Sequence, residues 1–348
     1  MNNESVLVSV IIVNYNAGKL LQDCVKSIYE SNHKNLEIIV VDNNSKDNSH
    51  IECKDNFSQI KLIENKENLG YCAGNNVGIN SANGKYIVIL NPDTTVTSSW
   101  LDELLIAESQ IGPGLFQPKI MVLNDENRIS NRGNMQTIFG FGFAQDRGLL
   151  EDNKTEKIKK INYATGTCLF TSREIFNKIG LFDPFLFLYH DDLDLGWRAS
   201  QLGIQSYYVP KSKIFHAESY SLKWSPKKFY WLERNRKYCL QTHYSKSTYK
   251  KMSFNIFLVD VLVFFFYLSK GFAGSKIKAD LDIRKNKKFI EKKYNELEAK
   301  KIIADEKIID SFSEEIYLPE NVFGNIIYRK YNSFLSYLSR KSRNLILK

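Results

Sequence analysis

The sequence has few cysteines, and their arrangement excludes two common kinds of site. Five cysteines are scattered along 348 residues, with no CxxC pair and an odd count. Structural zinc sites need closely spaced cysteines, and disulfide frameworks need matched ones. We therefore expect neither a zinc ribbon nor a disulfide scaffold, and a reducing cytosol is the expected setting.

The sequence also lacks a typical export signal and a long apolar segment. Its N-terminus, MNNESVLVSVIIVNYN, has no basic stretch before a short apolar run, which favours a first strand over a signal peptide. The most apolar run, FNIFLVDVLVFFFYL (254–268), is shorter than the ~20 residues of a spanning helix and contains Asp260. We expect this run to form a buried or interfacial helix.

Acidic residues are fewer than basic ones, 39 against 48, so the formal net charge is +9. Such a balance favours an anionic partner, which could be nucleotide phosphate, nucleic acid or lipid headgroups. Between Lys270 and Lys293 there are nine Lys or Arg against three acids, directly after the apolar run. This arrangement predicts binding to an anionic membrane surface, although a solvated helix is the alternative. No nucleic-acid partner is expected, because the folded N-terminal part shows no comparable basic stripe.

The N-terminal part of the sequence shows a repeated alternation of strand and helix. Apolar strands are predicted over 6–13, 36–45, 60–65 and 84–95, and the segments between them favour helices. This order predicts an α/β fold with a mostly parallel central sheet flanked by helices. Ligands bind beyond the carboxyl ends of such strands, where the polar clusters NYN (14–16), VDNNS (41–45) and NPDT (91–94) lie.

The remainder of the sequence has a less regular pattern. From about 112 to 165 we expect mixed short strands and loops. A strand is predicted over 168–171, then a helix that Ser172 caps and Gly180 ends, and a last strand over 205–210. The glycines of NLGYCAGNNVGI (68–79) do not have GxGxxG spacing and do not directly follow the first strand, so a dinucleotide site is not expected.

Six motifs in this order resemble one known family. They are VSVIIVNYN, VVDNNSKDNS, ENLGYCAGNNVGI, ILNPDT, ATGTCLFTSREIFNKIGLFDPFLFLYHDDLDLGWR and IFHAES. The combination resembles family 2 glycosyltransferases of the GT-A fold, and within them the rhamnosyltransferase-like branch. The resemblance covers about residues 6 to 245. It implies a GT-A domain over 1–245, and we expect 246–348 to be a helical, membrane-associated C-terminal extension.

The resemblance implies a set of donor-binding residues. Tyr15 is expected to stack on a pyrimidine base, and Asp42 to accept hydrogen bonds from the nucleoside. Asn68, Gly70 and Asn76 belong to the segment that wraps the nucleoside in this family. The alternatives are ordinary packing for Tyr15 and a turn or helix cap for Asp42, because DNNS is favourable turn chemistry.

The resemblance also implies a divalent metal ion, Mg²⁺ or Mn²⁺. Asn91 and Asp93 in NPD stand where the family has its metal-binding DxD, and His216 in IFHAES is similar to a histidine that completes the site. Asn91 replaces an Asp of many relatives and reduces the negative charge there. The alternatives are a Pro-containing turn and a structural histidine. Arg234 is expected near the diphosphate or the acceptor.

The resemblance also implies that the catalytic base lies in the acidic stretch HDDLD (190–194). In the family an acidic pair begins a helix on the acceptor side, and its second member takes the acceptor proton. Asp191 and Asp192 stand at these places, so Asp192 is the expected base and Asp191 an acceptor-side residue, while Asp194 is expected to be structural. The implied reaction is a single displacement that inverts the anomeric configuration.

The substrates are implied by the same resemblance. The donor would be a pyrimidine nucleotide sugar such as dTDP-rhamnose or a UDP-sugar. The acceptor would be a glycan, or a glycan on a polyprenyl carrier, at the cytoplasmic face of the cell membrane. The competing hypothesis is a non-catalytic nucleotide-sugar-binding or scaffold protein at the membrane, which predicts a damaged base or metal site.

Overall fold

The computed structural model describes residues 6–152, 156–217, 225–317 and 325–347. The chain forms two compact units, each of which is described by itself. The first unit consists of residues 1–134, 144–196 and 204–220. The second unit consists of residues 135–143, 197–203 and 221–348. This grouping is not a single cut at residue 245, and the predicted domain boundary stays a prediction.

The first unit is built around a sheet whose early strands alternate with helices. Its N-terminal elements are β1 (Val8–Asn14), α1 (Lys19–Glu30), β2 (Leu36–Asp42), α2 (Ser49–Asn56), β3 (Lys61–Glu64), α3 (Gly70–Ser81), β4 (Tyr86–Leu90), β5 (Thr94–Val96), α4 (Trp100–Ile111), β6 (Leu115–Val122) and β7 (Asp125–Asn131). The later elements are β10 (Lys159–Ile161), β11 (Cys168–Ser172), α5 (Arg173–Ile179), β12 (Ser206–His216) and the start of α6 (Asp191–Gln201). Two short strands, β8 (Asn134–Gln136) and β9 (Gly142–Ala144), pair with each other and lie mostly in the second unit.

The strand order of the main sheet is β10-β12-β6-β11-β4-β1-β2-β3, with β5 added on β12 and β7 on β6. Strands β3, β2, β1 and β4 are parallel, as the alternation of strands and helices predicts. Strand β11 lies antiparallel between β4 and β6. The predicted α/β class is thus confirmed, and the carboxyl ends of the parallel strands lie along one edge of the sheet.

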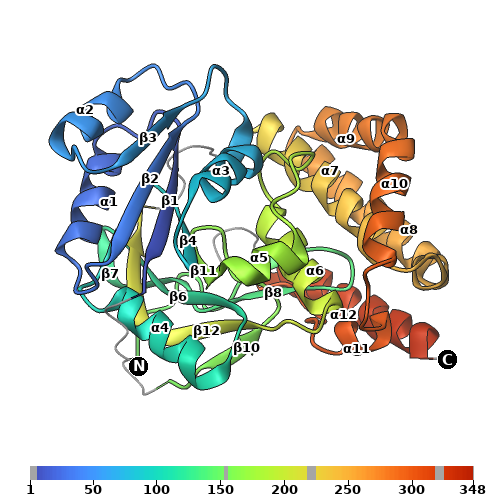
Figure 1. Cartoon of the computed structure of the whole chain (residues 1–348). Coiled ribbons are helices and arrows are strands. Elements are labelled where there is room, and N and C mark those ends of the chain that lie inside the picture. The colour runs from blue at the N-terminus through green and yellow to red at the C-terminus, as the bar shows by residue number, and fades with distance from the viewer. Residues whose placement is uncertain (1–5, 153–155, 218–224, 318–324, 348) are drawn as a thin grey trace. The chain divides into compact units, whose positions relative to one another are not determined.

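The core of this unit follows from the period of two in its strands. On β1, Val8, Val10 and Ile12 belong to a buried cluster with residues of α1 and α4. Ile11 points to the other face, where Gly78 of α3 lies so close that a Cβ atom there would collide with it. Helices α1 and α3 therefore cover opposite faces of the parallel strands (Figure 1).

Two strands differ from the sequence-based expectation. Strand β6 lies inside the region expected to hold short strands and loops, yet all but its last residue are buried. Pro118 and Lys119 interrupt its apolar pattern, so the sequence alone does not identify it as a central strand. Strand β12 continues past the predicted 205–210 to His216, with a register shift between Val209 and Lys213 that accommodates Pro210.

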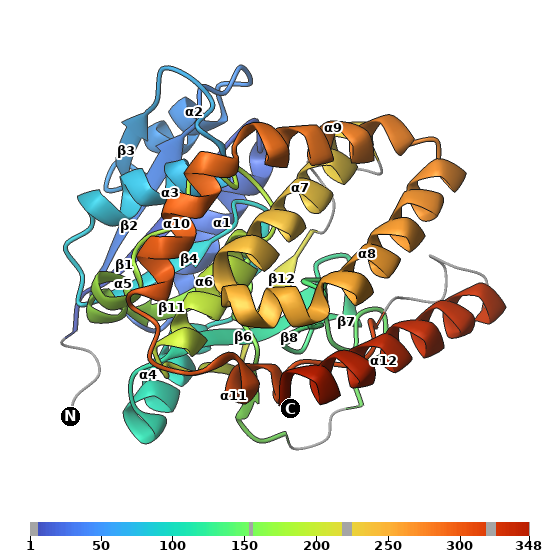
Figure 2. The ribbon, with the colours of Figure 1, turned by 90° about the vertical axis from the view of Figure 1, so that its right-hand side faces the viewer.

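The second unit is helical. Its helices are α7 (Pro226–His243), α8 (Lys246–Ser269), α9 (Ala273–Lys285), α10 (Lys287–Glu298), α11 (Asp305–Ile309) and α12 (Asn325–Leu347). Helix α7 packs against α9 and α10, and α8 packs against α9 and α12 (Figure 2). Helix α7 also contacts parts of this unit that precede it in the chain, since Arg236 donates to the Phe139 carbonyl at 3.0 Å and the His243 ring stacks on Trp197.

Helix α8 contains the most apolar run of the sequence and is longer than that run. In the described part of the chain, it is the one helix long and apolar enough to cross a membrane, with a mean hydropathy of 1.9 and 33% of its most apolar window buried. A single helix of this kind is weak support for a membrane span, since core helices pass the same test. Asp260 lies on this helix and pairs with Arg236 and Lys237 of α7.

Candidate active site

The carboxyl ends of β1 and β2 are joined by polar side chains. Asn14 and Asp42 are opposite each other in the parallel ladder. The Asn14 amide donates to Asp42 Oδ1 at 2.8 Å, and the Ser45 N–H donates to Asp42 Oδ2 at 2.9 Å. Asp42 is 2% exposed, so its carboxylate shapes the turn that follows β2. The turn role weighed from the sequence is present, and the nucleoside role stays a prediction.

Tyr15 lies at the end of β1 and is exposed to solvent. Its side chain is 51% exposed, which is unusual for a residue directly after a buried strand. The next residue, Asn16, has a left-handed backbone with φ 55° and accepts a hydrogen bond from the Lys46 N–H at 2.7 Å. These contacts fix the backbone beside Tyr15 and leave its ring accessible to a ligand.

The backbone N–H groups at the start of α3 form hydrogen bonds with other groups of the protein. Asn68 Oδ1 accepts a hydrogen bond from the Gly70 N–H at 2.8 Å, and the Phe187 carbonyl accepts one from the Tyr71 N–H at 2.8 Å. Gly70 has φ +78°, and a Cβ atom there would lie 2.5 Å from the Phe187 ring. Gly70 and the Tyr71 N–H thus hold the segment before Asp191, and Asn68 bonds to the first N–H of the helix, so the helix N-terminus is not an open phosphate site.

Asn76 also has a partner inside the protein. Its amide N–H donates to the Phe182 carbonyl at 2.8 Å, and its Oδ1 accepts from the Phe182 N–H at 3.0 Å. This paired contact fastens the chain after α5 to helix α3. The structure gives Asn76 a role in holding this segment, and its contact with the nucleoside stays a prediction.

Asp93 and His216 are brought together by strand pairing. Strands β5 and β12 are antiparallel, with Thr94 opposite His216, so Asp93 lies beside the end of β12. The distance between Asp93 Oδ2 and His216 Nε2 is 3.3 Å, and the two side chains are 13% and 15% exposed. A carboxylate and an imidazole that are close together and reach solvent can bind a divalent cation. Asn91 precedes Asp93 on the loop between β4 and β5.

The acidic residues that follow Leu188 begin helix α6. In the segment that precedes the helix, the residues Phe187, Tyr189 and His190 have left-handed backbones, with φ of 62°, 68° and 60°. Such conformations cost about 1–3 kcal/mol each in non-glycine residues and cluster at functional sites. The strained turn brings Asp191 and Asp192 into the first turn of the helix.

A short loop, Thr165–Thr167, forms hydrogen bonds both with the predicted base, Asp192, and with the loop that contains the NPD motif (91–93), called the NPD loop below. Asp192 Oδ2 accepts a hydrogen bond from the Gly166 N–H at 3.2 Å, and Oδ1 accepts one from the Leu193 N–H at 2.8 Å. The Thr167 carbonyl accepts a hydrogen bond from the Asn91 N–H at 3.0 Å. The Gly166 carbonyl accepts one from the Tyr71 hydroxyl at 2.6 Å. This short loop therefore contacts Asp192, the NPD loop and helix α3.

The two adjacent carboxyl groups have different environments. Burial and the charge of Asp192 raise the pKa of Asp191 well above its usual range. Burial also raises the pKa of Asp192, but hydrogen bonds from the Gly166 and Leu193 N–H groups oppose the rise. Burial and the nearby carboxylates raise the pKa of Tyr71, so its hydroxyl stays protonated and donates to Gly166. The environment favours the ionised form at Asp192 over Asp191.

Arg234 lies on α7 in the second unit and is engaged there. Its side chain is 5% exposed, its guanidinium lies 4.2 Å from the Trp231 ring centre, and Nη1 lies 3.7 Å from Asp282 Oδ2. This environment gives Arg234 a structural role in the helical unit. The expected place of Arg234 near the diphosphate or the acceptor stays a prediction.

Sequence reasoning overlooked several residues that organise this site. Asn14, Tyr71, Thr165 and Gly166 all lie inside motifs that were singled out, next to the residues that were chosen. Their positions in NYN, ENLGYCAGNN and ATGT are the signal that could have found them. Their contacts depend on the fold, because each one joins segments far apart in the chain.

Comparison with known proteins agrees with this geometry. Residues 9–180 match the profile of "Glycosyl transferase family 2". The chain is 25% identical over 240 residues to the N-acetylglucosaminyl-diphospho-decaprenol L-rhamnosyltransferase of Mycobacterium tuberculosis, covering 61% of this chain and 76% of the relative. It is 29% identical over 202 residues to the low-salt glycan biosynthesis hexosyltransferase Agl10 of Haloferax volcanii, covering 56% of this chain and 62% of that protein.

Solved structures show the same fold. The crystal structure of GalNAc-T7 with UDP, GalNAc and Mn²⁺ matches with a TM-score of 0.59 and 18% identity, covering 72% of this chain and about half (51%) of that chain. Residues 1–349 of S. aureus TarS match with a TM-score of 0.51 and 15% identity, covering 97% of this chain and 88% of that chain. These identities are too low to carry function, but the fold agrees with the profile match. The chain belongs to the family 2 glycosyltransferases and has the GT-A fold.

Proposed function

We propose that the protein is an inverting glycosyltransferase that transfers a sugar from a pyrimidine nucleotide sugar to a lipid-linked glycan. The observation that carries this proposal is the Thr165–Thr167 loop. It contacts Asp192 through Gly166 and the NPD loop through Asn91. A base for the acceptor and a site for the donor diphosphate are thereby held by one short segment, as a single displacement needs.

The donor is proposed to lie along the carboxyl edge of the parallel strands. The exposed ring of Tyr15 supports stacking on the base, and the turn that Asp42 shapes borders the same edge. UDP is present in the GalNAc-T7 structure, and a rhamnosyl group is transferred by the mycobacterial relative. A UDP-sugar and dTDP-rhamnose are therefore the two leading donors.

The residues at the end of β12 fit a divalent metal ion. Asp93 supplies a carboxylate oxygen and His216 an imidazole nitrogen, 3.3 Å apart, and both reach solvent. Mg²⁺ or Mn²⁺ bound there would offset the negative charge on the departing nucleoside diphosphate. The Mn²⁺ in the GalNAc-T7 structure supports this type of cofactor without choosing between the two ions.

Asp192 is proposed to act as the general base. Its two oxygens are oriented by the Gly166 and Leu193 N–H groups, which also stabilise the carboxylate form. Each oxygen retains a lone pair that can accept the proton of the acceptor hydroxyl. Asp191 is proposed to stay on the acceptor side in its protonated form, where burial keeps its pKa high.

The acceptor is proposed to be a glycan on a polyprenyl diphosphate at the cytoplasmic face of the membrane. The name of the mycobacterial relative describes such an acceptor, N-acetylglucosaminyl-diphospho-decaprenol. The apolar helix α8 and the basic segment that follows it support a peripheral location at an anionic surface.

The deciding experiment compares Asp192→Asn with Asp191→Asn in single-turnover transfer assays, with donor affinity measured in parallel. Asp192→Asn preserves shape but removes the proton acceptor, so transfer should fall by about 10²–10⁴ while donor binding survives. Near-normal transfer by Asp192→Asn, together with an inactive Asp191→Asn that still binds donor, would move the base to Asp191. Donor binding without any transfer by the wild type would instead favour the non-catalytic alternative.

The pH profile gives a second readout of the same residue. The base must be ionised, and burial raises the pKa of Asp192 above the ordinary aspartate value of 3.8. Activity should therefore rise with pH through a value above 3.8 and fall away below it. An acidic limb of kcat/KM that lies at or below the ordinary aspartate pKa would contradict the proposed base.

A further inference from the structure

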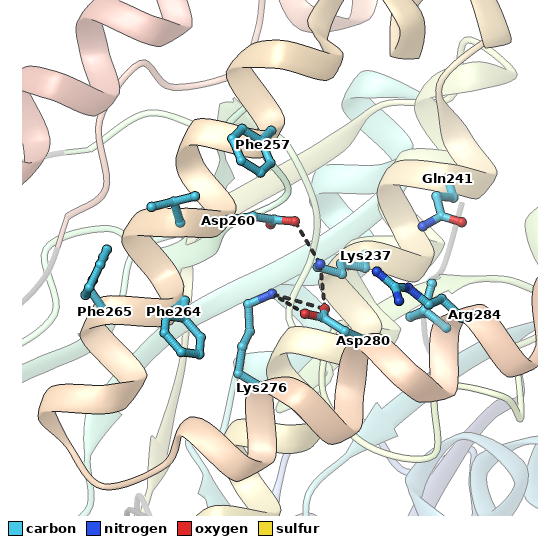
Figure 3. A pocket seen from close by; sticks show the side chains of 11 residues that line it. Lys237, Gln241, Phe257, Asp260, Phe264, Phe265, Lys276, Asp280 and Arg284 are labelled. Carbon is cyan, nitrogen blue, oxygen red and sulfur yellow. Dashed lines mark hydrogen bonds and ion pairs between the residues drawn. The ribbon is translucent and has the colours of Figure 1, made fainter.

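The helical unit contains a pocket that the proposed reaction does not use. It has a volume of about 520 Å³ and lies between α7, α8 and α9 (Figure 3). Its lining residues come from these helices and are Lys237, Gln241, Phe257, Asp260, Val261, Phe264, Phe265, Lys276, Asp280, Ile283 and Arg284. The set combines charged groups with large apolar ones, so its natural ligand should have both characters.

The innermost charged groups of the pocket are paired with one another. Lys237 Nζ lies 2.7 Å from Asp260 Oδ2 and 2.5 Å from Asp280 Oδ1. Lys276 Nζ lies 3.0 Å from Asp280 Oδ2 (Figure 3). Behind the lining, Glu233 pairs with Lys276 and Arg236 pairs with Asp260. Three cations and three carboxylates therefore balance, and this part of the pocket attracts neither sign of charge strongly.

Arg284 is different, because its charge is not balanced. The side chain is exposed near the end of α9, and within the described residues it has neither an ion pair nor a hydrogen bond. The lining thus carries three cations, Lys237, Lys276 and Arg284, against the two carboxylates. A guanidinium presents several N–H donors in a planar fork, which suits the oxygens of a phosphate group.

The α8 side of the pocket is apolar and open to solvent. Phe257 is 59% exposed and Phe265 is 60% exposed, while Phe264 and Val261 are partly buried. Large aromatic side chains exposed together on one helix mark a surface that another apolar group covers. An extended hydrocarbon chain could cover these rings without needing hydrogen-bond partners.

We propose that this pocket binds a lipid with a phosphate headgroup, its phosphate at Arg284 and its hydrocarbon chain against the phenylalanines of α8. The surplus positive charge and the apolar wall each match one part of such a molecule. The inference rests on the proposed function, since a polyprenyl-linked acceptor contains both parts. A soluble anion would leave the phenylalanines exposed, and a neutral lipid would leave Arg284 without a partner.

The test uses the full chain and a short isoprenyl phosphate, farnesyl phosphate, with farnesol and inorganic phosphate as its two halves. Binding is measured by calorimetry below the aggregation limit of the lipid. Farnesyl phosphate should bind at least about tenfold more tightly than either half, because only it engages both features. Equal binding of inorganic phosphate would reveal a simple anion site, and equal binding of farnesol a purely apolar one. Either result would overturn the proposal.

Matched variants separate the pocket from general surface properties. Arg284→Ala should weaken binding about tenfold or more, whereas Lys285→Ala removes the same charge from the same helix turn outside the pocket and should have little effect. Phe265→Ser should weaken binding, whereas Phe254→Ser changes an equally exposed ring of α8 that does not line the pocket. Equal losses within either pair would overturn the proposal.

A control in the same samples distinguishes this proposal from the proposed function. Binding of UDP or dTDP to the first unit should be unchanged in Arg284→Ala and Phe265→Ser. Nucleotide binding without selective binding of farnesyl phosphate would refute the lipid pocket alone. Selective farnesyl phosphate binding without nucleotide binding or transfer would refute the glycosyltransferase proposal and leave the pocket standing.

Discussion

Asp192 is positioned through a main-chain N–H group on the Thr165–Thr167 loop, and that loop is in turn held by a tyrosine. The Tyr71 hydroxyl donates to the Gly166 carbonyl, while the Gly166 N–H donates to Asp192. Gly166 leaves no room for a side chain, because a Cβ atom there would lie 2.5 Å from the Tyr71 oxygen. Gly166 and Tyr71 together therefore position Asp192, the proposed base.

Substitution of both residues tests this positioning role. Gly166→Ala should displace the loop and lower the rate of transfer by about 10- to 100-fold with donor affinity retained. In the Tyr71→Phe background the same substitution should cost less, because the nearest remaining ring atom is 3.1 Å from the new Cβ. Single-turnover rates of the two single variants and the double variant measure this coupling.

A suitable control is Gly274→Ala, since a Cβ atom at Gly274 would meet nothing within 4 Å. Its transfer rate should equal that of the wild type. If the losses of Gly166→Ala and Tyr71→Phe simply add in the double variant, the two residues act independently and the positioning role is refuted.

At the scale of the elements, antiparallel pairing of β5 with β12 creates the candidate metal site. We predict that Asp93→Ala and His216→Ala each weaken the Mn²⁺-dependent binding of UDP, because each removes one ligand. Thr95→Ala is the control, since Thr95 lies on the same short strand opposite Phe215. Titration calorimetry with and without Mn²⁺ measures the effect, and full activity in excess EDTA would exclude a metal role.

Helix α8 illustrates how a charge inside an apolar element can stabilise it. Asp260 pairs with Arg236 and Lys237, whose charges lower its pKa from 3.8 to about 2. We expect Asp260→Ala to lower the free energy of unfolding by about 3 kcal/mol, since Arg236 would lose a partner while buried. Chemical denaturation at pH 7 measures this difference.

The pH dependence of that difference has a defined sign. A carboxyl group with a lowered pKa in the folded state stabilises the protein above its unfolded pKa, and the contribution is lost as the pH falls toward the folded pKa. The difference in the free energy of unfolding between the wild type and Asp260→Ala should therefore shrink as the pH falls from about 4 to about 2. Asp310→Ala, an exposed acid in the same unit, should show little effect. A difference that does not change with pH would contradict the assigned ion pairs.

The elements also show where sequence reasoning succeeds. Strands β1 to β4 and helix α5 follow local rules, and the predicted cap is present, since Ser172 accepts a hydrogen bond from the Ile175 N–H. The bounds and the burial of strand β6 were not predicted, because its Gln117 and Lys119 are polar, yet buried. Gln117 donates to Asn131 from within the sheet, and Lys119 pairs with Glu151 and Glu156. Such partners come from distant segments, so local pattern cannot identify them.

The candidate site shows the same division. The pairing of Asp93 with His216 was anticipated from the resemblance, whereas the internal contacts of Asn76 and Arg234 were not. Asn76 binds the backbone of Phe182, and Arg234 stacks on Trp231. A polar side chain in a motif can contact either a ligand or the protein, and only the three-dimensional structure distinguishes the two.

For the molecule as a whole, the net charge of +9 and the apolar surface of α8 predict salt-sensitive membrane binding. We expect the protein to sediment with vesicles that contain anionic lipid and to be largely released as NaCl is raised from 0.05 to about 1 M, where charges are screened beyond about 3 Å. Vesicles of neutral lipid are the control and should retain less protein. Equal binding to both kinds of vesicle at low salt would exclude an electrostatic contribution.

The buried charges of α7 determine how this prediction can be tested. Glu233, Arg236 and Lys237 find partners on α8 and α9, including Asp260 and Lys276. A truncation after residue 250 would remove these partners and leave the charges of α7 uncovered. Point substitutions on the exposed face of α8 are therefore the better test of membrane binding.

The left-handed residues ahead of α6 have a consequence for variants selected in the laboratory. Selection for heat resistance alone should favour asparagine or glycine at Tyr189 and His190, because these residues tolerate φ near +60°. The same replacements would make the turn before Asp192 less rigid, and the rate of transfer would fall. Thermal robustness and catalytic speed thus compete at these two positions, and a library screened for both should retain the strained native residues.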